Sequence, residues 1–416
     1  MKNLLTLGLL LSTIFVFSQN QENGRSFIKS LFEEKDIQKT YAYLDPAAQA
    51  KITEKGLKDM QEQLQVQLGK FLSIIESNIE EKNYYYFTAF EKMKLDIKIT
   101  FSENKMISGF LFVPHKEFNQ KKLGTELDIE SGTIKLHGTL LNPNGDSKKL
   151  VIFVHGSGPQ DRDETLIENK PFKDIAENLF QNGIASYRFD KRTLSNPESF
   201  NDKSTIDDEV TNDVINVVKY FRNSKEFAAS EIIILGHSLG AYMLPRIANK
   251  SDQIGKIILL AGNSRPISQL VTEQFDYLLK VNPTPELEKD SKKMKTQISY
   301  LSSKEFNLNS PKESLPFNMS AYYWKSMQEY NPLKEIKKIK IPILILQGER
   351  DYQVSMTDFE LWHSNLKNHD NASFISYPKL NHLFIIGEKP STPQEYAIKG
   401  NVDTSVITDI SNFIAK

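Results

Sequence analysis

The stretch ILGHSLGAY at residues 234–242 places a serine between two glycines in the pattern G-x-S-x-G. This pattern is typical of a sharp strand-to-helix turn on which the serine hydroxyl stands exposed. A serine hydroxyl is a weak nucleophile at neutral pH, so a histidine must take its proton and a carboxylate must orient that histidine. We therefore predict Ser238 as a nucleophile, the alternative being an ordinary serine that opens a helix.

The acid is expected in the loop GERDYQV, which follows the apolar run IPILILQG. Asp351 lies deeper in this loop than Glu349, which directly follows the glycine. Triad acids in this chain order come from the loop after a strand. We predict Asp351 as the acid and keep Glu349 as the alternative.

The base is expected among the histidines that follow. His382 alone lies in a loop, PKLNHLF, directly after a strand-like run, SFISYP. His363 belongs to the helical segment DFELWHSNL and His369 to the turn KNHDN, so both are expected at the surface. We predict His382 as the base, and we expect His237, beside the serine, to pack or to support the site.

A tetrahedral intermediate also needs two N–H donors for its negative charge. We predict the backbone N–H of Leu239 as one donor and that of Ser157, in the loop HGSGPQDRDE, as the other, with Gly158 in reserve. His155 is expected to hold this loop by a hydrogen bond.

The charged triplet Asp161, Arg162 and Asp163 follows a Gly-Pro turn in the same loop. Such a triplet is typical of a solvated loop or a local ion pair of small energetic consequence. The alternative hypothesis is that it pairs with the strand-end group FDKR at residues 189–192 and braces the site.

Short apolar runs alternate with helical patterns through the second part of the chain. The runs are KLVIFV, IASYRF, EIIIL, KIILLAG, IPILILQG and SFISYP, and PFKDIAENLFQNG and DDEVTNDVINVVKYF are amphipathic helices between them. DIESGTIKLHGTLLNP reads as two further strands joined by a turn. This alternation predicts an α/β domain at residues 125–416, with a mostly parallel sheet covered by helices on both faces.

About 70 residues between KIILLAG and IPILIL leave this pattern and are rich in aromatic residues and methionine. So long a connection is uncommon in a compact domain, so we predict a helical cap insertion at about 265–332. Some of its aromatic residues are expected to line an acyl pocket, and most are expected to form the core of the cap itself.

The N-terminal part differs in pattern. A lysine at position 2, an apolar stretch at residues 7–17 and small-residue spacing at Val16 and Ser18 predict a signal peptide at residues 1–18, so the protein is expected to be exported, periplasmic or secreted. Residues 24–116 change from a helical period to strand-like alternation, which predicts a small α+β domain. Tyrosines 84–86 are interpreted as core of this domain.

Composition excludes several classes of protein. A net charge of -1 provides no basic excess for a run of phosphates, so nucleic acid is not expected as a partner. The chain contains no cysteine, which excludes disulfides and thiolate metal sites. The apolar N-terminal stretch is too short for a comfortable membrane span, so no stable span is expected after signal cleavage.

Together the motifs GHSLG, HGSGP, GERD and the late NH resemble the α/β-hydrolase superfamily, and in particular its bacterial carboxylesterases. The resemblance covers about residues 125–416 and implies the order Ser238, Asp351, His382, with no metal or organic cofactor. One departure is DKRTLSNP, where relatives often have D-x-R-G-x-G. Residues 26–115 resemble a small domain of unknown function that precedes some bacterial hydrolases.

The leading hypothesis is thus a serine hydrolase that cleaves small carboxylic esters through an acyl-enzyme. A serine peptidase on the same fold is the alternative, with a short peptide as substrate and an amino terminus held by Glu286, Glu288 or Asp290 of the cap. Those acidic residues are also typical of a solvated helix face. The third hypothesis is an inactive hydrolase fold that only binds, and the N-terminal domain is itself a candidate binding module.

Overall fold

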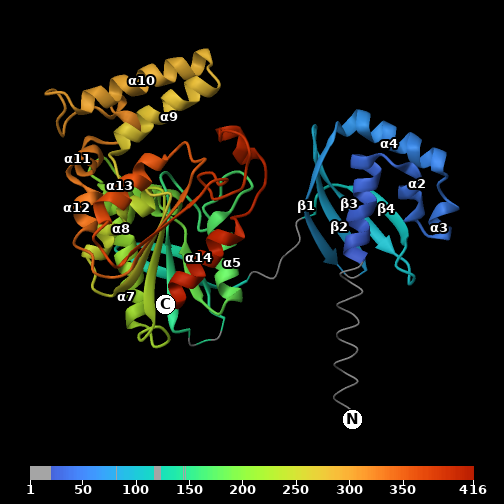
Figure 1. Cartoon of the computed structure of the whole chain (residues 1–416), viewed down its shortest axis with the longest axis horizontal. Coiled ribbons are helices and arrows are strands. Elements are labelled where there is room, and N and C mark those ends of the chain that lie inside the picture. The colour runs from blue at the N-terminus through green and yellow to red at the C-terminus, as the bar shows by residue number, and fades with distance from the viewer. Residues whose placement is uncertain (1–19, 81, 117–122, 144, 146) are drawn as a thin grey trace, which may run out of the picture. The chain divides into compact units, whose positions relative to one another are not determined.

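The computed structural model describes residues 20–80, 82–116, 123–143, 145 and 147–416. The chain divides into an N-terminal unit, Met1–Lys121, and a C-terminal unit, Lys122–Lys416 (Figure 1). The predicted domains at 24–116 and 125–416 lie one within each unit. The predicted signal peptide at residues 1–18 lies outside the described residues.

The N-terminal unit packs short helices on one antiparallel sheet. Helical residues 20–29 continue into η1 (Ser30–Glu34), and the sheet has the order β1-β2-β3-β4. The remaining elements are α2 (Ile37–Ala42), α3 (Pro46–Gln49), α4 (Glu54–Leu68), β1 (Phe71–Glu80), β2 (Asn83–Phe90), β3 (Lys94–Phe101) and β4 (Ile107–Val113). Asp36, Asp45 and Thr53 cap α2, α3 and α4, because each side chain accepts a free N–H of the first helical turn.

Strand β1 is not identified by the sequence analysis, which predicts only a change from a helical period to strand-like alternation within residues 24–116. The pairing of β1 with β2 shifts register between Phe71 and Ser73 and again between Ile74 and Glu76. Such bulges break the strict alternation by which a strand is recognised in a sequence. The interpretation of tyrosines 84–86 as core is confirmed, since all three are buried in this sheet.

The described residues of the C-terminal unit form an eight-stranded sheet in the order β12-β11-β10-β9-β7-β8-β6-β5. The pairs β5-β6 and β6-β8 are antiparallel, and the other neighbours are parallel. The strands are β5 (Thr125–Ser131), β6 (Ile134–Leu141), β7 (Lys149–Val154), β8 (Ala185–Phe189), β9 (Glu231–His237), β10 (Ile254–Leu260), β11 (Ile343–Gly348) and β12 (Ala372–Tyr377). The mostly parallel sheet predicted from the apolar runs is confirmed.

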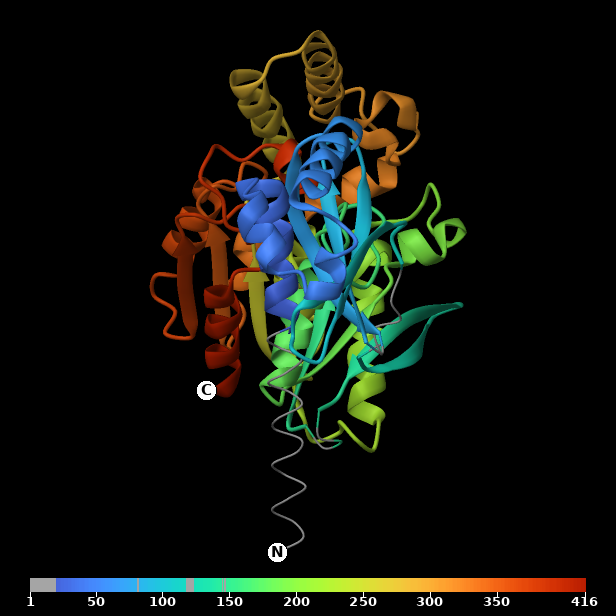
Figure 2. The same cartoon turned by 90° about the vertical axis from the view of Figure 1, so that its right-hand side faces the viewer.

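Helices cover both faces of this sheet (Figures 1 and 2). Along β9, Ile232 and Ile234 belong to one hydrophobic core, and Ile233 and Leu235 belong to the other. The core of α5 (Pro171–Gln181) and α14 (Thr404–Ala415) lies on one face; the core of α7 (Asn212–Asn223), α8 (Leu239–Asn249) and α13 (Met356–Leu366) lies on the other. Two buried faces explain why the strands read as continuous apolar runs.

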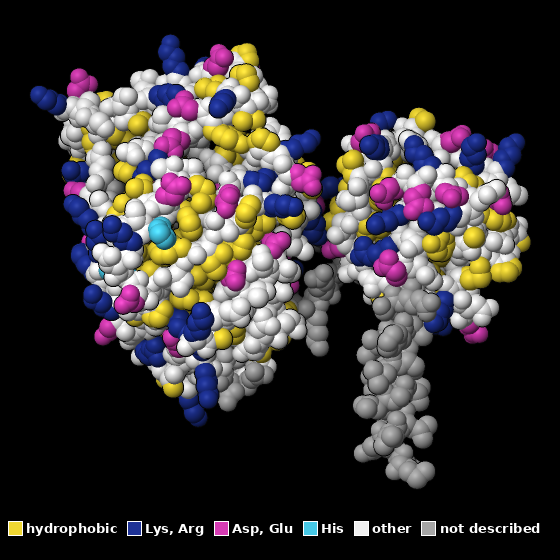
Figure 3. Space-filling model, viewed as in Figure 1, with side chains coloured by type: hydrophobic (Ala, Val, Ile, Leu, Met, Phe, Trp, Pro, Cys, Tyr) yellow, Lys and Arg dark blue, Asp and Glu magenta, His cyan; other side chains and the backbone are white. Residues whose placement is uncertain are grey.

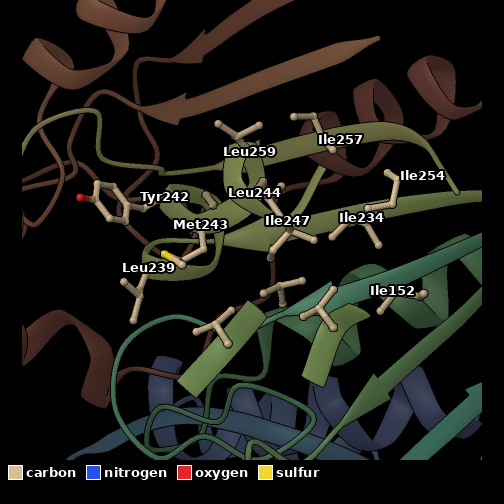
Figure 4. Close-up of a cluster of buried hydrophobic side chains, with 14 of the residues drawn as sticks. Ile152, Ile234, Leu239, Tyr242, Met243, Leu244, Ile247, Ile254, Ile257 and Leu259 are labelled. Carbon is tan, nitrogen blue, oxygen red and sulfur yellow. The ribbon is translucent and has the colours of Figure 1, made fainter. Parts of the chain in front are cut away.

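Helix α8 is central to the core that it shares with α7 and α13. Figure 4 shows its Leu239, Met243, Leu244 and Ile247 beside isoleucines of β7, β9 and β10. All four side chains are buried. Packing of this kind anchors the beginning of α8, which is also where the GHSLG turn ends.

The insertion predicted at 265–332 is helical. Between β10 and β11 lie α9 (Ile267–Val281), α10 (Pro285–Leu301), η4 (Lys312–Ser314), η5 (Pro316–Asn318), α11 (Ala321–Glu329) and α12 (Pro332–Ile336). Helices α9 and α10 pack together and stand above the sheet in Figure 1. We call the segment from α9 to α11 the cap.

Charged side chains of both signs are scattered over the surfaces seen in Figure 3. This distribution agrees with the net charge of -1. Within the described ranges, no helix has both the length and the apolar character that crossing a membrane requires.

The short remaining elements of the C-terminal unit are α6 (Arg192–Ser195), η2 (Pro197–Ser199), η3 (Asp207–Thr211) and η6 (Pro393–Ala397).

Candidate active site

Ser238 lies on a strained turn between β9 and α8. Its backbone has φ 52° and ψ −117°, a conformation that non-glycine residues rarely adopt. A Cβ on Gly240 would lie 2.1 Å from Val154 O, and a Cβ on Gly236 would lie 2.6 Å from the carbonyl carbon of Gly240. The two glycines are therefore required for a turn this tight, and the turn lifts Ser238 above the end of β9.

Asp351 and His382 are in direct contact although they come from different loops. Asp351 Oδ2 lies 2.6 Å from His382 Nδ1, and both side chains are buried. The other carboxylate oxygen accepts the N–H groups of Gln353 at 2.7 Å and Val354 at 3.0 Å. A carboxylate acceptor at this distance favours the tautomer with the proton on Nδ1, which leaves Nε2 free to accept a proton.

The alternatives for acid and base lie elsewhere. Glu349 is exposed and accepts a hydrogen bond from Ser376 Oγ at 2.8 Å. His363 is exposed on α13, and His369 is half-buried in the turn before β12. Gln347, which the sequence reading did not single out, donates from Nε2 to Asp351 Oδ2 at 3.1 Å and helps to hold the carboxylate.

Ser238 and His382 are brought together through His237. His237 directly precedes Ser238, its Nε2 lies 2.9 Å from the backbone oxygen of His382, and the two imidazole rings are 4.6 Å apart. Within the described residues, Ser238 Oγ and His382 Nε2 do not form a hydrogen bond. Catalytic hydrogen bonds are often long without substrate and tighten when it binds.

His237 also contacts Glu164, a residue that the sequence reading did not assign to the site. His237 Nδ1 and Glu164 Oε2 lie 3.0 Å apart, which is close enough for an ion pair. The ring N–H does not point straight at this oxygen, so the two atoms do not form a hydrogen bond. Burial opposes a charge on this ring, but Glu164, the His382 carbonyl and Asp351 together outweigh burial and raise the pKa of His237 above its ordinary value. Glu164 lies at the end of the quoted loop HGSGPQDRDE, so the only signal in the sequence was its proximity to that motif.

The two predicted oxyanion donors lie at one cavity with Ser238. Ser157, Gly158 and Leu239 all line this cavity of about 560 Å³. Among the described residues, no acceptor takes the backbone N–H of Ser157 or Leu239. The loop after β7 also runs close to the nucleophile, because a Cβ on Gly156 would lie 3.3 Å from Ser238 Cβ.

His155 does not hold this loop in the predicted way. Its Nε2 is buried and has no hydrogen-bond partner in the described part of the chain. The ring instead packs against Phe172 and Phe189, with centroids 5.4 and 5.3 Å away. Burial lowers the pKa of His155 to about 4, so the ring is neutral and acts by packing.

The charged triplet after HGSGP is paired with the end of β8. Arg162 binds Asp190 through Nε and Nη2, at 3.1 and 2.8 Å, and binds Glu126 at 2.6 Å. Asp163 pairs with Arg188 and Lys170, and Asp161 Oδ1 accepts the N–H of Thr165 at 2.8 Å. The contacts of Arg162 and the pair of Asp163 with Arg188 join the loop to the sheet, which is the arrangement that the bracing hypothesis predicts.

A buried cluster of Lys191, Glu209 and Tyr323 adjoins the cavity and was not expected. Lys191 Nζ lies 2.5 Å from Glu209 Oε1, and Tyr323 donates to Glu209 Oε2 at 2.6 Å. Glu209 itself is buried. It lies in η3, a π-helical turn, a local form that is frequent at functional sites.

The rest of the cavity is mostly apolar. Of the aromatic and methionine residues that the sequence places in the cap, five line the cavity. The five are Phe317, Met319, Tyr323, Trp324 and Met327. Helix α9 of the cap adds Ile267, Leu270, Val271 and Gln274, and the other lining residues come from the sheet domain. Glu286 and Asp290, proposed to hold an amino terminus, are exposed on α10, and neither they nor Glu288 line this cavity.

Each of the two units matches a known protein family. Residues 145–390, more than half of the chain, match the family described as serine aminopeptidase, S33. Residues 26–110 match a family described as a protein of unknown function (DUF3887). Esterase EstD of Thermotoga maritima is 31% identical over 417 residues, a match that covers 97% of each chain.

A solved structure supports the fold alone. An esterase of Pyrococcus furiosus superposes with a TM-score of 0.50 at 17% identity, and the match covers 72% of this chain and 95% of that one. The eight-stranded sheet, the strained serine turn and the sequence matches agree. The chain therefore belongs to the serine aminopeptidase (S33) family of α/β-hydrolases, with a DUF3887 domain before the hydrolase domain, and it is an esterase-like serine hydrolase.

Proposed function

We propose that this protein hydrolyses carboxylic esters of small molecules through an acyl-enzyme formed on Ser238. The observation that carries the proposal is the 2.6 Å contact between Asp351 and His382, beside the strained Ser238 turn at the mouth of an apolar cavity. The name of the relative in Thermotoga maritima, an esterase, supports the same class of substrate.

In this mechanism His382 Nε2 takes the proton of Ser238 as Oγ attacks the ester carbonyl carbon. Asp351 holds the imidazole in the correct tautomer and stabilises its positive charge. The N–H groups of Leu239 and Ser157 stabilise the oxyanion. His382 then gives the proton to the leaving alcohol. In the second half of the reaction, His382 takes a proton from water as the water oxygen attacks the acyl carbon, and it returns this proton to Ser238 Oγ as the acid leaves.

The lining of the cavity favours an ester over a peptide with a free amino terminus. Glu209 is the only acidic residue among those that line the described cavity, and both of its oxygens already accept hydrogen bonds. An ammonium group would therefore find no free carboxylate there. An apolar lining suits an acyl chain, because burying it removes apolar surface from water.

The test is turnover of p-nitrophenyl esters of graded chain length and labelling by a fluorophosphonate, in which Ser238 Oγ bonds to phosphorus and fluoride leaves. Both are expected in the wild type and absent in Ser238→Ala. Ser364→Ala, an exposed serine on α13, is the matched control and should behave as the wild type. Labelling without ester turnover would contradict ester specificity, and no labelling would contradict the nucleophile.

We also propose that the chain is exported after cleavage behind Ser18. The basis is the lysine at position 2 and the apolar stretch at residues 7–17, which have the length and order of a signal peptide. Mass spectrometry of the protein from an extracytoplasmic fraction should then give Gln19 as the first residue. Protein that still begins at Met1 would contradict this proposal.

A further inference from the structure

The loop that carries Ser157 is held by buried charged groups on both sides of Gly156. The Gly156 N–H donates to Glu164 Oε1 at 2.6 Å. The Gly156 carbonyl accepts from Lys191 Nζ at 2.8 Å, and the Gly158 carbonyl accepts from the same Nζ at 3.1 Å. The backbone N–H of Lys191 also donates to Gln160 O at 3.0 Å, so Lys191 binds this loop through both its main chain and its side chain.

The bond from Lys191 to the Gly156 carbonyl determines where the Ser157 N–H points. The peptide between Gly156 and Ser157 is trans, and the C=O and N–H of a planar trans peptide point in opposite directions. Because Lys191 holds the C=O, the N–H of Ser157 is turned to the side away from Lys191. Without that ammonium group, the peptide next to a glycine has little to stop it from rotating.

Lys191 is in turn held by Glu209 of η3, which Tyr323 of the cap contacts. Glu209 accepts from Lys191 with one oxygen and from Tyr323 of α11 with the other. Glu209 and Tyr323 both line the cavity. A continuous chain of contacts therefore runs from the cavity wall through Tyr323, Glu209 and Lys191 to the Gly156 carbonyl.

We propose that Lys191 is a positioning residue that presets the oxyanion hole, and that Glu209 of η3 and Tyr323 of the cap hold it in place. This inference rests on the proposed function, since it assigns a role to the Ser157 N–H. A simple structural ion pair between Lys191 and Glu209 would stabilise the fold without acting on the transition state.

The test is Lys191→Met in the full chain. Since removal of one oxyanion donor lowers kcat by about 10²-fold or more, we expect a kcat loss of about that size with KM nearly unchanged. The affinity for an alkyl boronic acid, whose tetrahedral adduct needs the oxyanion hole, should fall by a similar factor. The rate of fluorophosphonate labelling is expected to fall with it.

Lys256→Met is the matched control. Lys256 is also a buried lysine, in strand β10, and its Nζ pairs with Glu231 and with the Ile414 carbonyl, within the β9–β10–α14 part of the unit. This variant should lose stability but keep its kcat and its boronic acid affinity. If Lys191→Met behaved in the same way, with kcat unchanged, the proposal would be wrong.

Tyr323→Phe is a milder variant that keeps the test valid if Lys191→Met does not fold. It removes one hydrogen bond to Glu209 and leaves the ring in the cavity wall. We expect a few-fold fall in kcat and an equal fall in boronic acid affinity; a change in KM alone would contradict the proposal. If the wild type turned over no ester at all, the proposed function would be wrong. A slower fluorophosphonate labelling in Lys191→Met, but not in Lys256→Met, would still support the positioning role of Lys191.

Discussion

The two units of the molecule use buried polar groups in different ways. In the N-terminal unit they mostly satisfy local backbone or each other: Ser30 Oγ lies 2.7 Å from Thr40 Oγ1, and Thr88 donates to Leu95 O at 2.9 Å. In the C-terminal unit, buried charges meet from distant segments where parallel strands end. The groups that meet there are Glu164 with His237, Lys191 with Glu209, and Asp351 with His382.

This difference distinguishes a structural core from a site. Removing a charge from water costs several kcal/mol, and a buried ion pair often repays no more than that cost. Several such pairs gathered near the Ser238 turn and the loop after β7 are therefore poorly explained by stability, and perturbed charged groups gather at functional sites. The N-terminal unit has an aromatic core of comparable quality, but its described residues show no comparable group of buried charges.

The largest effect is expected at the carboxylate of the C-terminal unit. Asp351→Asn keeps the size of the side chain but favours the wrong tautomer of His382, so kcat should fall by about 10⁴-fold. Steady-state kinetics with a p-nitrophenyl ester measures this. Glu349→Gln, an exposed neighbour two residues away, should retain its kcat. The assignment of the acid would be reversed if Glu349→Gln were the slower enzyme.

A smaller effect, confined to the other unit, is expected for Leu57→Ala. Leu57 is fully buried in the N-terminal core, so its truncation should lower the free energy of unfolding of that unit by about 2–5 kcal/mol. The chain has two tryptophans, Trp324 and Trp362, and both lie in the C-terminal unit. Tryptophan fluorescence should therefore show an unchanged transition and kcat should not change, while circular dichroism shows earlier loss of helix. A shift of the fluorescence transition would mean that the two cores are coupled.

The smallest effect is a pH dependence from His155. Burial holds the pKa of this ring at about 4 in the folded state, below its ordinary value of 6.5. Between these values the unfolded chain binds a proton that the folded chain excludes, so stability falls as pH falls from 6.5 to 4, by roughly 3 kcal/mol in all. In His155→Asn this part of the pH dependence should disappear from fluorescence-detected urea unfolding. The exposed His363→Asn serves as control, and equal curves for wild type and His155→Asn would show that His155 does not titrate as described.

Much of the architecture could be predicted from local pattern. Strands β7 to β11 are buried on both faces and read as apolar runs. The partly exposed β5 and β6 were found as two strands joined by a turn, and β12 was found from its short apolar run. Strand β1 was missed because two register shifts break its alternation. The hydrogen bond predicted for His155 is not formed by Nε2, because the ring packs against Phe172 and Phe189 rather than beside an acceptor.

The residues Ser238, Asp351 and His382 could be selected from the sequence because each follows a strand-like run in the order of a known fold. Their supporting residues could not. Glu164, Lys191 and Glu209 are common charged residues in polar segments, and nothing in their neighbours along the chain separates them from solvated ones.

The sequence by itself determined the α/β alternation, the glycines of the serine turn and the order of the three candidate catalytic residues, since these depend on periodicity and on local backbone geometry. Only the tertiary structure decided which charges are buried and which partners they meet. Burial and pairing are set by segments far apart in the chain, such as β8, η3 and α11 around Lys191. The orientation of the Ser157 peptide is a consequence of that packing, and no local pattern encodes it.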